Sequence, residues 1–187
     1  MSDDISDIFD AGVVKFINSK APNIVPNDFI KEYEVDVEKL AKLLGYQVQF
    51  EDLPYSGELH EDTIIVNKKN VPTRQRFTIA HELGHAAEHQ SEAKRRGGIG
   101  RYGLQERFDE ITANKFASEL LMPVKLVIRS LLKSADDNGY NSQRLTSGEV
   151  AQMETGASSM LNVSTEALKY RVENLGIFRK QSDERIH

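Results

Sequence analysis

Apolar residues recur along most of this chain at the three- and four-residue spacing of amphipathic helices. The spacing predicts helices over residues 5–19, 28–45, 72–89, 105–121 and 124–133. After a polar gap, one more helix is predicted by the apolar residues Val150, Met153, Ala157 and Leu161. Ser164 suits the N-cap of a last helix, which Gly176 ends. The prediction is therefore a mainly helical chain.

Three short segments have the features of β-strands instead. Residues 47–50 alternate polar and apolar side chains, and residues 63–66 are rich in β-branched residues. Turn-forming residues at 53–57 separate these two segments, and residues 58–60 suit a short edge strand. Together the elements predict an α+β fold. In it, a small antiparallel sheet packs on the helix at 72–89 and on further helices.

The elements group into three segments along the chain. Residues 1–27 form an N-terminal extension that contains two prolines near its end. Residues 28–123 contain the strands and the two helices with the strongest patterns, and Met122-Pro123 closes the second of these. Residues 124–187 form a C-terminal helical segment whose last helical pair has the spacing of a helix-turn-helix. We expect this segment to pack on the domain before it.

Composition narrows the classes of protein to consider. The 187 residues include no cysteine, so disulfides and cysteine-ligated zinc are excluded. The net charge of −5 comes from residues 1–123, whereas residues 124–187 are nearly balanced, which argues against nucleic-acid binding through phosphates. No apolar run is long enough to span a membrane, and the acidic start lacks the features of a secretory signal. We therefore expect a cytoplasmic protein.

The most informative motif is His81-Glu82-Leu83-Gly84-His85, within the predicted helix at 72–89. Side chains four residues apart lie on one face of a helix, so His81 and His85 can bind one metal ion. Glu82 lies beside that ion as a candidate general base. The competing interpretation is a pair of core histidines without a metal. A third ligand would favour the metal site over the pair of core histidines, because catalytic zinc usually has three protein ligands and one open position.

The helix predicted at 105–121 is the place to look for the third ligand. Glu110 falls on the apolar stripe of this helix, one turn before Ala113. An ionised carboxylate facing the core is costly unless a cation neutralises it, and a bound metal would do so. The alternative is a surface charge paired with an arginine. Glu106, one turn earlier, is the reserve ligand, and Asn114, one turn later, can orient a ligating imidazole.

A second motif block follows the first one. It reads Glu110-Ile111-Thr112-Ala113-Asn114-Lys115-Phe116-Ala117-Ser118-Glu119-Leu120-Leu121-Met122-Pro123. With residues 76–85, this block resembles the ImmA/IrrE family of metallopeptidase-like proteins, whose typical block is E-x-E-A-N-x-F-A-x-x-L-L-M-P. Thr112 stands where a second glutamate is common, and this departure leaves Glu110 untouched. The resemblance extends loosely over most of residues 30–178. It implies a gluzincin-type site whose third metal ligand is Glu110.

The resemblance also implies a function. It implies a hydrolase, namely a metal-dependent endopeptidase. Two histidines and a carboxylate suit Zn²⁺ best as ligands, although Mn²⁺ or another divalent ion is compatible. Related proteins typically cleave a helix-turn-helix repressor and so relieve repression of stress-response or mobile-element genes, and others belong to toxin–antitoxin pairs. We therefore expect a cognate repressor or antitoxin as the partner. The alternative is a metal-stabilised toxin or regulator-binding protein without proteolytic activity.

Two basic features leave further interpretations open. The dense cluster Lys94-Arg95-Arg96 is interpreted as a solvated loop, with a contact to substrate or nucleic acid as the alternative. Direct DNA binding through the last helical pair is disfavoured on charge. Its second helix contains acidic as well as basic residues: Glu166, Lys169, Arg171 and Glu173. Packing against the metal domain is the preferred interpretation of this pair.

Overall fold

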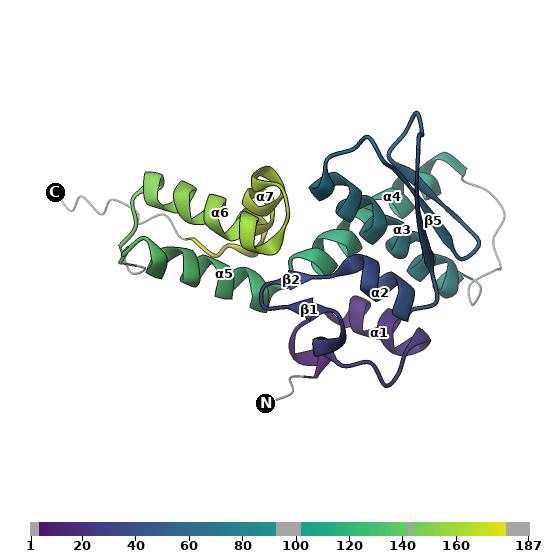
Figure 1. Cartoon of the computed structure of the whole chain (residues 1–187), viewed down its shortest axis with the longest axis horizontal. Coiled ribbons are helices and arrows are strands. Elements are labelled where there is room, and N and C mark those ends of the chain that lie inside the picture. Colours follow the sequence, from purple (N-terminus) through teal and green to yellow (C-terminus); the bar gives the residue numbers. More distant parts are fainter. Residues whose placement is uncertain (1–3, 93–101, 142–143, 179–187) are drawn as a thin grey trace.

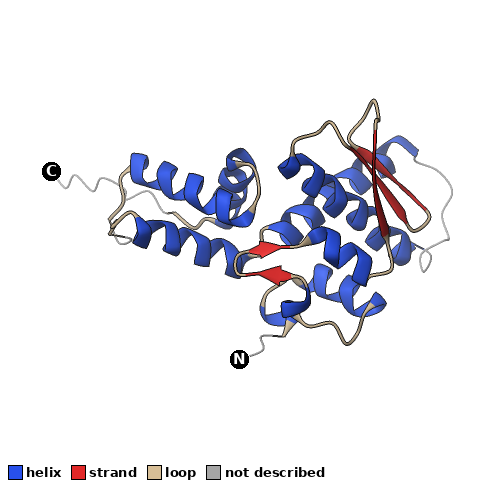
Figure 2. Ribbon diagram, in the orientation of Figure 1, coloured by secondary structure: helices blue, strands red, loops and turns tan. Residues whose placement is uncertain are grey.

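The computed structural model describes residues 4–92, 102–141 and 144–178. Helices dominate over two small sheets, which confirms the α+β class (Figures 1 and 2). In chain order the elements are η1 (Ile5–Asp7), α1 (Ala11–Lys20), η2 (Pro26–Asp28), β1 (Ile30–Lys31), β2 (Glu34–Val35), α2 (Val37–Leu43), β3 (Gln47–Glu51), β4 (Gly57–His60), β5 (Thr63–Asn67), α3 (Pro72–Glu92), α4 (Tyr102–Leu121), α5 (Val124–Asp137), α6 (Ser147–Leu161) and α7 (Thr165–Leu175).

The N-terminal residues contribute to the core. The helix predicted at residues 5–19 is divided between η1 and α1. Between them, Phe9 stacks on Phe29 with ring centroids 5.7 Å apart. Phe16 of α1 meets Phe116 of α4 edge-on, with centroids 5.6 Å apart. These buried aromatic contacts hold the N-terminal helices against the body of the fold.

Residues 28–45 do not form the single helix that their apolar spacing predicts. β1 and β2 pair as an antiparallel hairpin, and α2 begins only at Val37. The hairpin turn places Glu32 at a φ of +46°, outside the right-handed helical region. Asp36 then caps α2, because its carboxylate accepts a hydrogen bond from the backbone N–H of Lys39. Apolar spacing alone does not separate a short hairpin followed by a helix from one longer helix.

The larger sheet has the strand order β3-β5-β4. The predicted antiparallel arrangement is correct for β4 and β5 but wrong for β3 and β5, which pair in parallel. The chain leaves β3, forms β4 at the opposite edge, and returns as β5 between them. The central strand is the most buried one, with Ile64 and Val66 both 0% exposed. Alternation along a strand identifies the strand but not its neighbours, so the order and directions could not be predicted.

α3 packs against both the larger sheet and α4. The first motif block lies in α3, and most of the second lies in α4. Ile79, Ala80 and Leu83 of α3 are fully buried. Gly84 lies directly against α4, because a Cβ at this position would come within 2.9 Å of the Cα of Ala113. A glycine inside a helix usually costs stability, and here it permits the close approach of two helices. This approach brings the side chains of the two motif blocks to one place.

α5, α6 and α7 extend to one side of the body, coloured green to yellow in Figure 1. Arg171 of α7 donates a hydrogen bond to the carbonyl of Met122 and lies 3.4 Å from the Asp10 carboxylate. Its side chain is only 11% exposed, so this basic residue of the predicted helical pair is directed into the protein rather than outward. In the described part of the chain, no helix combines the length and apolar character needed to cross a membrane.

Candidate metal centre and its cleft

α3 presents His81 and His85 on one face, as their spacing requires. Their Nε2 atoms are 3.0 Å apart, and the two rings meet edge-on with centroids 4.6 Å apart. Both side chains are largely buried, with 16% and 20% of their surface exposed. Burial, together with the neighbouring His85, lowers the pKa of His81. The His81 ring is therefore neutral at pH 7 and has one nitrogen lone pair to offer.

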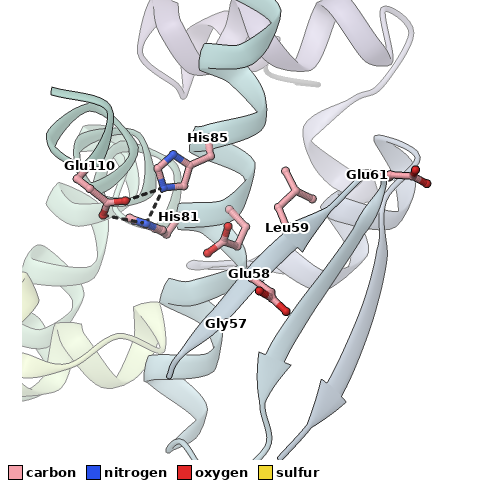
Figure 3. Close-up of a pocket in the computed structure, with 8 residues that line it drawn as sticks. Gly57, Glu58, Leu59, Glu61, His81, His85 and Glu110 are labelled. Carbon is pink, nitrogen blue, oxygen red and sulfur yellow. Dashed lines mark hydrogen bonds and ion pairs between the residues drawn. The ribbon is translucent and has the colours of Figure 1, made fainter. Parts of the chain in front are cut away.

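Glu110 reaches the same point from α4 (Figure 3). One carboxylate oxygen lies 3.5 Å from Nε2 of His81, and the other lies 3.2 Å from Nε2 of His85. The Glu110 side chain is 59% exposed, so the prediction that it faces the core is wrong. The buried position on this part of α4 is Ala113, and Glu110 lies one turn earlier, where the helix face opens onto solvent. The residue chosen from the sequence is at the site, although the burial argument for it does not hold.

Asn114 lies on the outer side of His81. Its Oδ1 is 3.1 Å from Nδ1 of His81, so that this ring nitrogen can donate a hydrogen bond to the amide oxygen. A hydrogen on Nδ1 leaves the lone pair on Nε2, which points to His85 and Glu110. The geometry is the one expected of a residue that orients a ligating imidazole.

Glu82 lies next to the three candidate ligands but is not one of their group. It lines the same cleft and is only 7% exposed. Burial, followed by the nearby carboxylates of Glu110 and Glu58, raises the pKa of Glu82 to about 7. A carboxylate with a pKa near neutrality can both accept and release a proton under ordinary conditions, which is what a general base and acid must do.

The cleft has a volume of about 680 Å³ and is lined by residues of β4, its turn, α3 and α4 (Figure 3). β4 is the edge strand of the larger sheet. Ser56, which precedes β4, accepts a hydrogen bond from the amide of Asn67. Antiparallel alternation then directs the backbone N–H and C=O groups of Gly57 and Leu59 away from β5, toward the open edge. Such groups can pair with an extended peptide.

Some residues of this cleft were missed by sequence reasoning. Gly57 was assigned only to a turn and Glu58 only to a short edge strand, and Glu61 was assigned to no element. The alternating segment before β5 signals a strand, but nothing in it indicates which element it faces. The structure explains why position 57 is a glycine. A Cβ there would lie 2.5 Å from the carbonyl oxygen of Ile65 and could not be accommodated.

Several predicted features lie outside the described part of the structure. The side chain of Glu106, the reserve ligand, is not described. The basic cluster Lys94-Arg95-Arg96 and the nearby Arg101 also lie outside the described residues. The described candidate ligands therefore remain His81, His85 and Glu110.

The donor set fits a divalent cation. One ligand atom from each of His81, His85 and Glu110 lies within 4.8 Å of the others. Two donors bound tetrahedrally to zinc, each at about 2.0–2.1 Å, are themselves about 3.3 Å apart. The two Nε2 atoms are 3.0 Å apart, close to that value, and each lies 3.2–3.5 Å from one of the two Glu110 oxygens. These side chains can therefore converge on one ion with little rearrangement.

Two histidines one helical turn apart, an adjacent buried glutamate and a carboxylate from the next helix define a metallopeptidase-type site. Comparison with known families agrees with this class. A peptidase family model described as the IrrE N-terminal-like domain matches residues 41–173. The chain belongs to this family of metal-dependent peptidases, which confirms the resemblance to the ImmA/IrrE family. A search of curated proteins gave no match.

Proposed function

We propose that this protein is a zinc-dependent endopeptidase with Glu82 as its general base. The main supporting observation is the convergence of His81, His85 and Glu110 at one point of the cleft that Glu82 also lines. A Zn²⁺ held by these three residues would supply a Lewis acid that polarises a peptide carbonyl and acidifies water. Two imidazoles and a carboxylate suit zinc, and manganese is the compatible second candidate. Metal analysis of the protein purified without added metal distinguishes the two.

Each side chain of the proposed centre has a distinct task. Glu82 takes a proton from the attacking water and delivers it to the departing amine, a double task suited to its raised pKa. Asn114 keeps the His81 ring in one orientation through Nδ1. The open edge of β4 holds the peptide in an extended conformation beside these groups.

We further propose that the substrate is a cognate helix-turn-helix repressor or antitoxin, whose cleavage relieves transcriptional repression. The support for this substrate is family membership, since the residues of the cleft are compatible with many peptides. Direct binding of the protein to nucleic acid is not part of the proposal. Its net charge is −5, and Arg171 is occupied by internal contacts.

The test is to mix the zinc-loaded protein with any helix-turn-helix protein that a neighbouring gene encodes and to identify fragments by mass spectrometry. We expect cleavage at one site by the wild type. Glu82→Gln is the matched control, because it keeps the shape of the side chain and removes the base. This variant should bind one equivalent of zinc as the wild type does, and its cleavage rate should fall about 10²–10⁴-fold. Full cleavage by Glu82→Gln would contradict the assigned base. An intact partner that stays bound to the metal-loaded wild type would favour the non-proteolytic alternative.

A further inference from the structure

Apart from the two histidines, the titratable side chains that line the cleft are all acidic. They are Glu58, Glu61, Glu82 and Glu110, and no lysine or arginine of the described residues lines this cleft. Arg74 lies on the same helix as the histidines, but it lines a separate apolar pocket. Its guanidinium donates hydrogen bonds to Oγ of Ser56. Within the described part of the chain, the cleft has no basic lining residue to offset its carboxylates.

A bound divalent cation does not remove this negative charge. Glu110 is a candidate ligand and Glu82 lies beside the ligands, so a cation there is balanced mainly by these two carboxylates. Glu58 and Glu61 lie on the β4 side of the cleft, outside the ligand group (Figure 3). Their charges can therefore interact with a peptide that is bound along β4. Of the two, Glu61 lies in the turn at the far end of the strand, and Glu58 lies nearer the candidate ligands.

Glu58 occupies a specific position relative to the open strand edge. It lies between Gly57 and Leu59, the two residues whose backbone groups point away from β5. The Glu58 side chain is 38% exposed, and its carboxylate lies 4.0 Å from Nε2 of His60 on the same strand. A carboxylate has about four lone-pair sites, so this one long contact with a largely exposed imidazole leaves acceptor capacity unused. A cationic side chain of a peptide paired with β4 can reach these free sites.

We propose that the cleft selects peptide segments with a lysine or arginine close to the scissile bond, and that Glu58 is a specificity-determining residue. Glu61 adds a longer-range attraction along the same strand. This inference rests on the proposed peptidase function, which it deepens by naming the chemistry of the preferred substrate. An acidic segment would be disfavoured, because like charges would face each other in a partly enclosed cleft.

The test measures binding separately from cleavage. Two pools of fluorescent peptides, identical except that one has lysine and the other glutamate at fixed positions, are titrated against Glu82→Gln protein loaded with one equivalent of Zn²⁺. We expect the lysine pool to bind about tenfold more tightly at low salt and the difference to shrink at high salt. Adding Glu58→Gln should reduce this preference about fivefold, and adding Glu58→Lys should abolish or invert it.

The control is Glu51→Gln on β3, a charge removed from the same sheet at an exposed position that does not line the cleft. It should leave the preference unchanged, and circular dichroism identifies any variant that fails to fold. Equal binding of the two pools, or the same preference in the Glu58→Gln and Glu51→Gln proteins, would overturn the proposal. Cleavage of the pools by the wild type is measured in parallel by mass spectrometry. A lysine preference without cleavage would count against the peptidase function and still support the cationic specificity of the cleft.

Discussion

At the scale of single residues, the orientation of His81 depends on one neighbour. The hydrogen bond between Nδ1 of His81 and Oδ1 of Asn114 joins α3 to α4 at the point where the candidate ligands meet. Without it the imidazole can rotate about its side-chain bonds, and Nε2 loses its fixed direction. The effect of Asn114 should therefore appear in metal affinity rather than in the integrity of the fold.

We expect Asn114→Ala to weaken Zn²⁺ binding about tenfold, because a partner that orients a ligand is worth about that much or more. The affinity is measured by competition with a chelating dye. Thr112→Ala is the control on the same helix, since Thr112 is exposed and its hydroxyl donates a hydrogen bond to the carbonyl of Phe108. Equal zinc affinities of Asn114→Ala and Thr112→Ala would show that Asn114 does not orient the ligand.

At the residue scale, the sequence could place two side chains relative to each other where one helix determined the geometry. His81 and His85 could be paired because the helical repeat alone places them on one face. Glu110 belongs to another helix, and its choice depended on an expected burial that the structure contradicts. The family resemblance pointed to the same residue. Glu58 could not be predicted as part of the cleft, because nothing local to β4 indicates that this strand borders the same cleft as α3 and α4.

At the scale of elements, the distance between α3 and α4 depends on Gly84. The Cα of Ala113 lies so close that any side chain at position 84 must push the two helices apart. Because α3 contains both histidines and α4 contains Glu110, a small shift here changes the separation of the candidate ligands. Packing of these helices and metal affinity are thus coupled.

Gly84→Ala should therefore destabilise the protein by about 1–3 kcal/mol, as other overpacked positions do, and should weaken zinc binding as well. Chemical denaturation and the dye competition measure the two effects. Gly12→Ala in α1 is the control, because nothing lies within 4 Å of a Cβ at that position. It should be neutral or stabilising by up to about 1 kcal/mol. A Gly84→Ala protein as stable as wild type would contradict the close packing described here.

The start of α2 depends on the charge of Asp36. Burial alone would raise the pKa of this carboxylate, but hydrogen bonds from the Lys31 side chain and the Lys39 backbone outweigh it and lower the pKa. A lowered folded-state pKa stabilises the protein above the unfolded value of 3.8, and this contribution is lost as the pH falls through the folded pKa. The ionised form of Asp36 therefore stabilises the protein at neutral pH, and acid removes this stabilisation.

Asp36→Asn removes this titration and keeps a side chain that caps helices well. We expect the variant to be less stable than the wild type at pH 7, and the difference to shrink as the pH falls below about 4. Thermal unfolding of both proteins, from pH 7 to below about pH 4, measures this difference in stability. The prediction would be contradicted if the stability difference were constant with pH.

At the scale of the whole molecule, a buried ion pair connects segments far apart in sequence. The Arg76 guanidinium lies 2.6 Å from the Glu34 carboxylate of β2 and also donates to the carbonyls of Val35 and Asn162. Asn162 lies between α6 and α7, and its side-chain amide donates to the same carboxylate. Arg76 therefore joins the helix of the metal centre, the small hairpin and the C-terminal helices.

Arg76→Ala should cost about 3 kcal/mol or more, because it leaves a partly buried carboxylate and two carbonyls without their donor. Lys69→Ala is the matched control, since its pair with Asp52 is largely exposed and should contribute less than about 1 kcal/mol. Urea denaturation measures both changes. Similar effects of the two substitutions would show that Arg76 does not hold the segments together.

The sequence by itself determined the elements with a strong repeat and the pair of histidines, because helical periodicity and the spacing within one helix are local properties. The start and end of α7 followed from its capping residues, Ser164 and Gly176, for the same reason. The boundaries at residues 1–27, 28–123 and 124–187 stay predictions. Only the tertiary structure decided the parallel pairing of β3 with β5, the hairpin at β1 and β2, and the exposure of Glu110. These features depend on which segments meet in space, and no repeat along the chain records that.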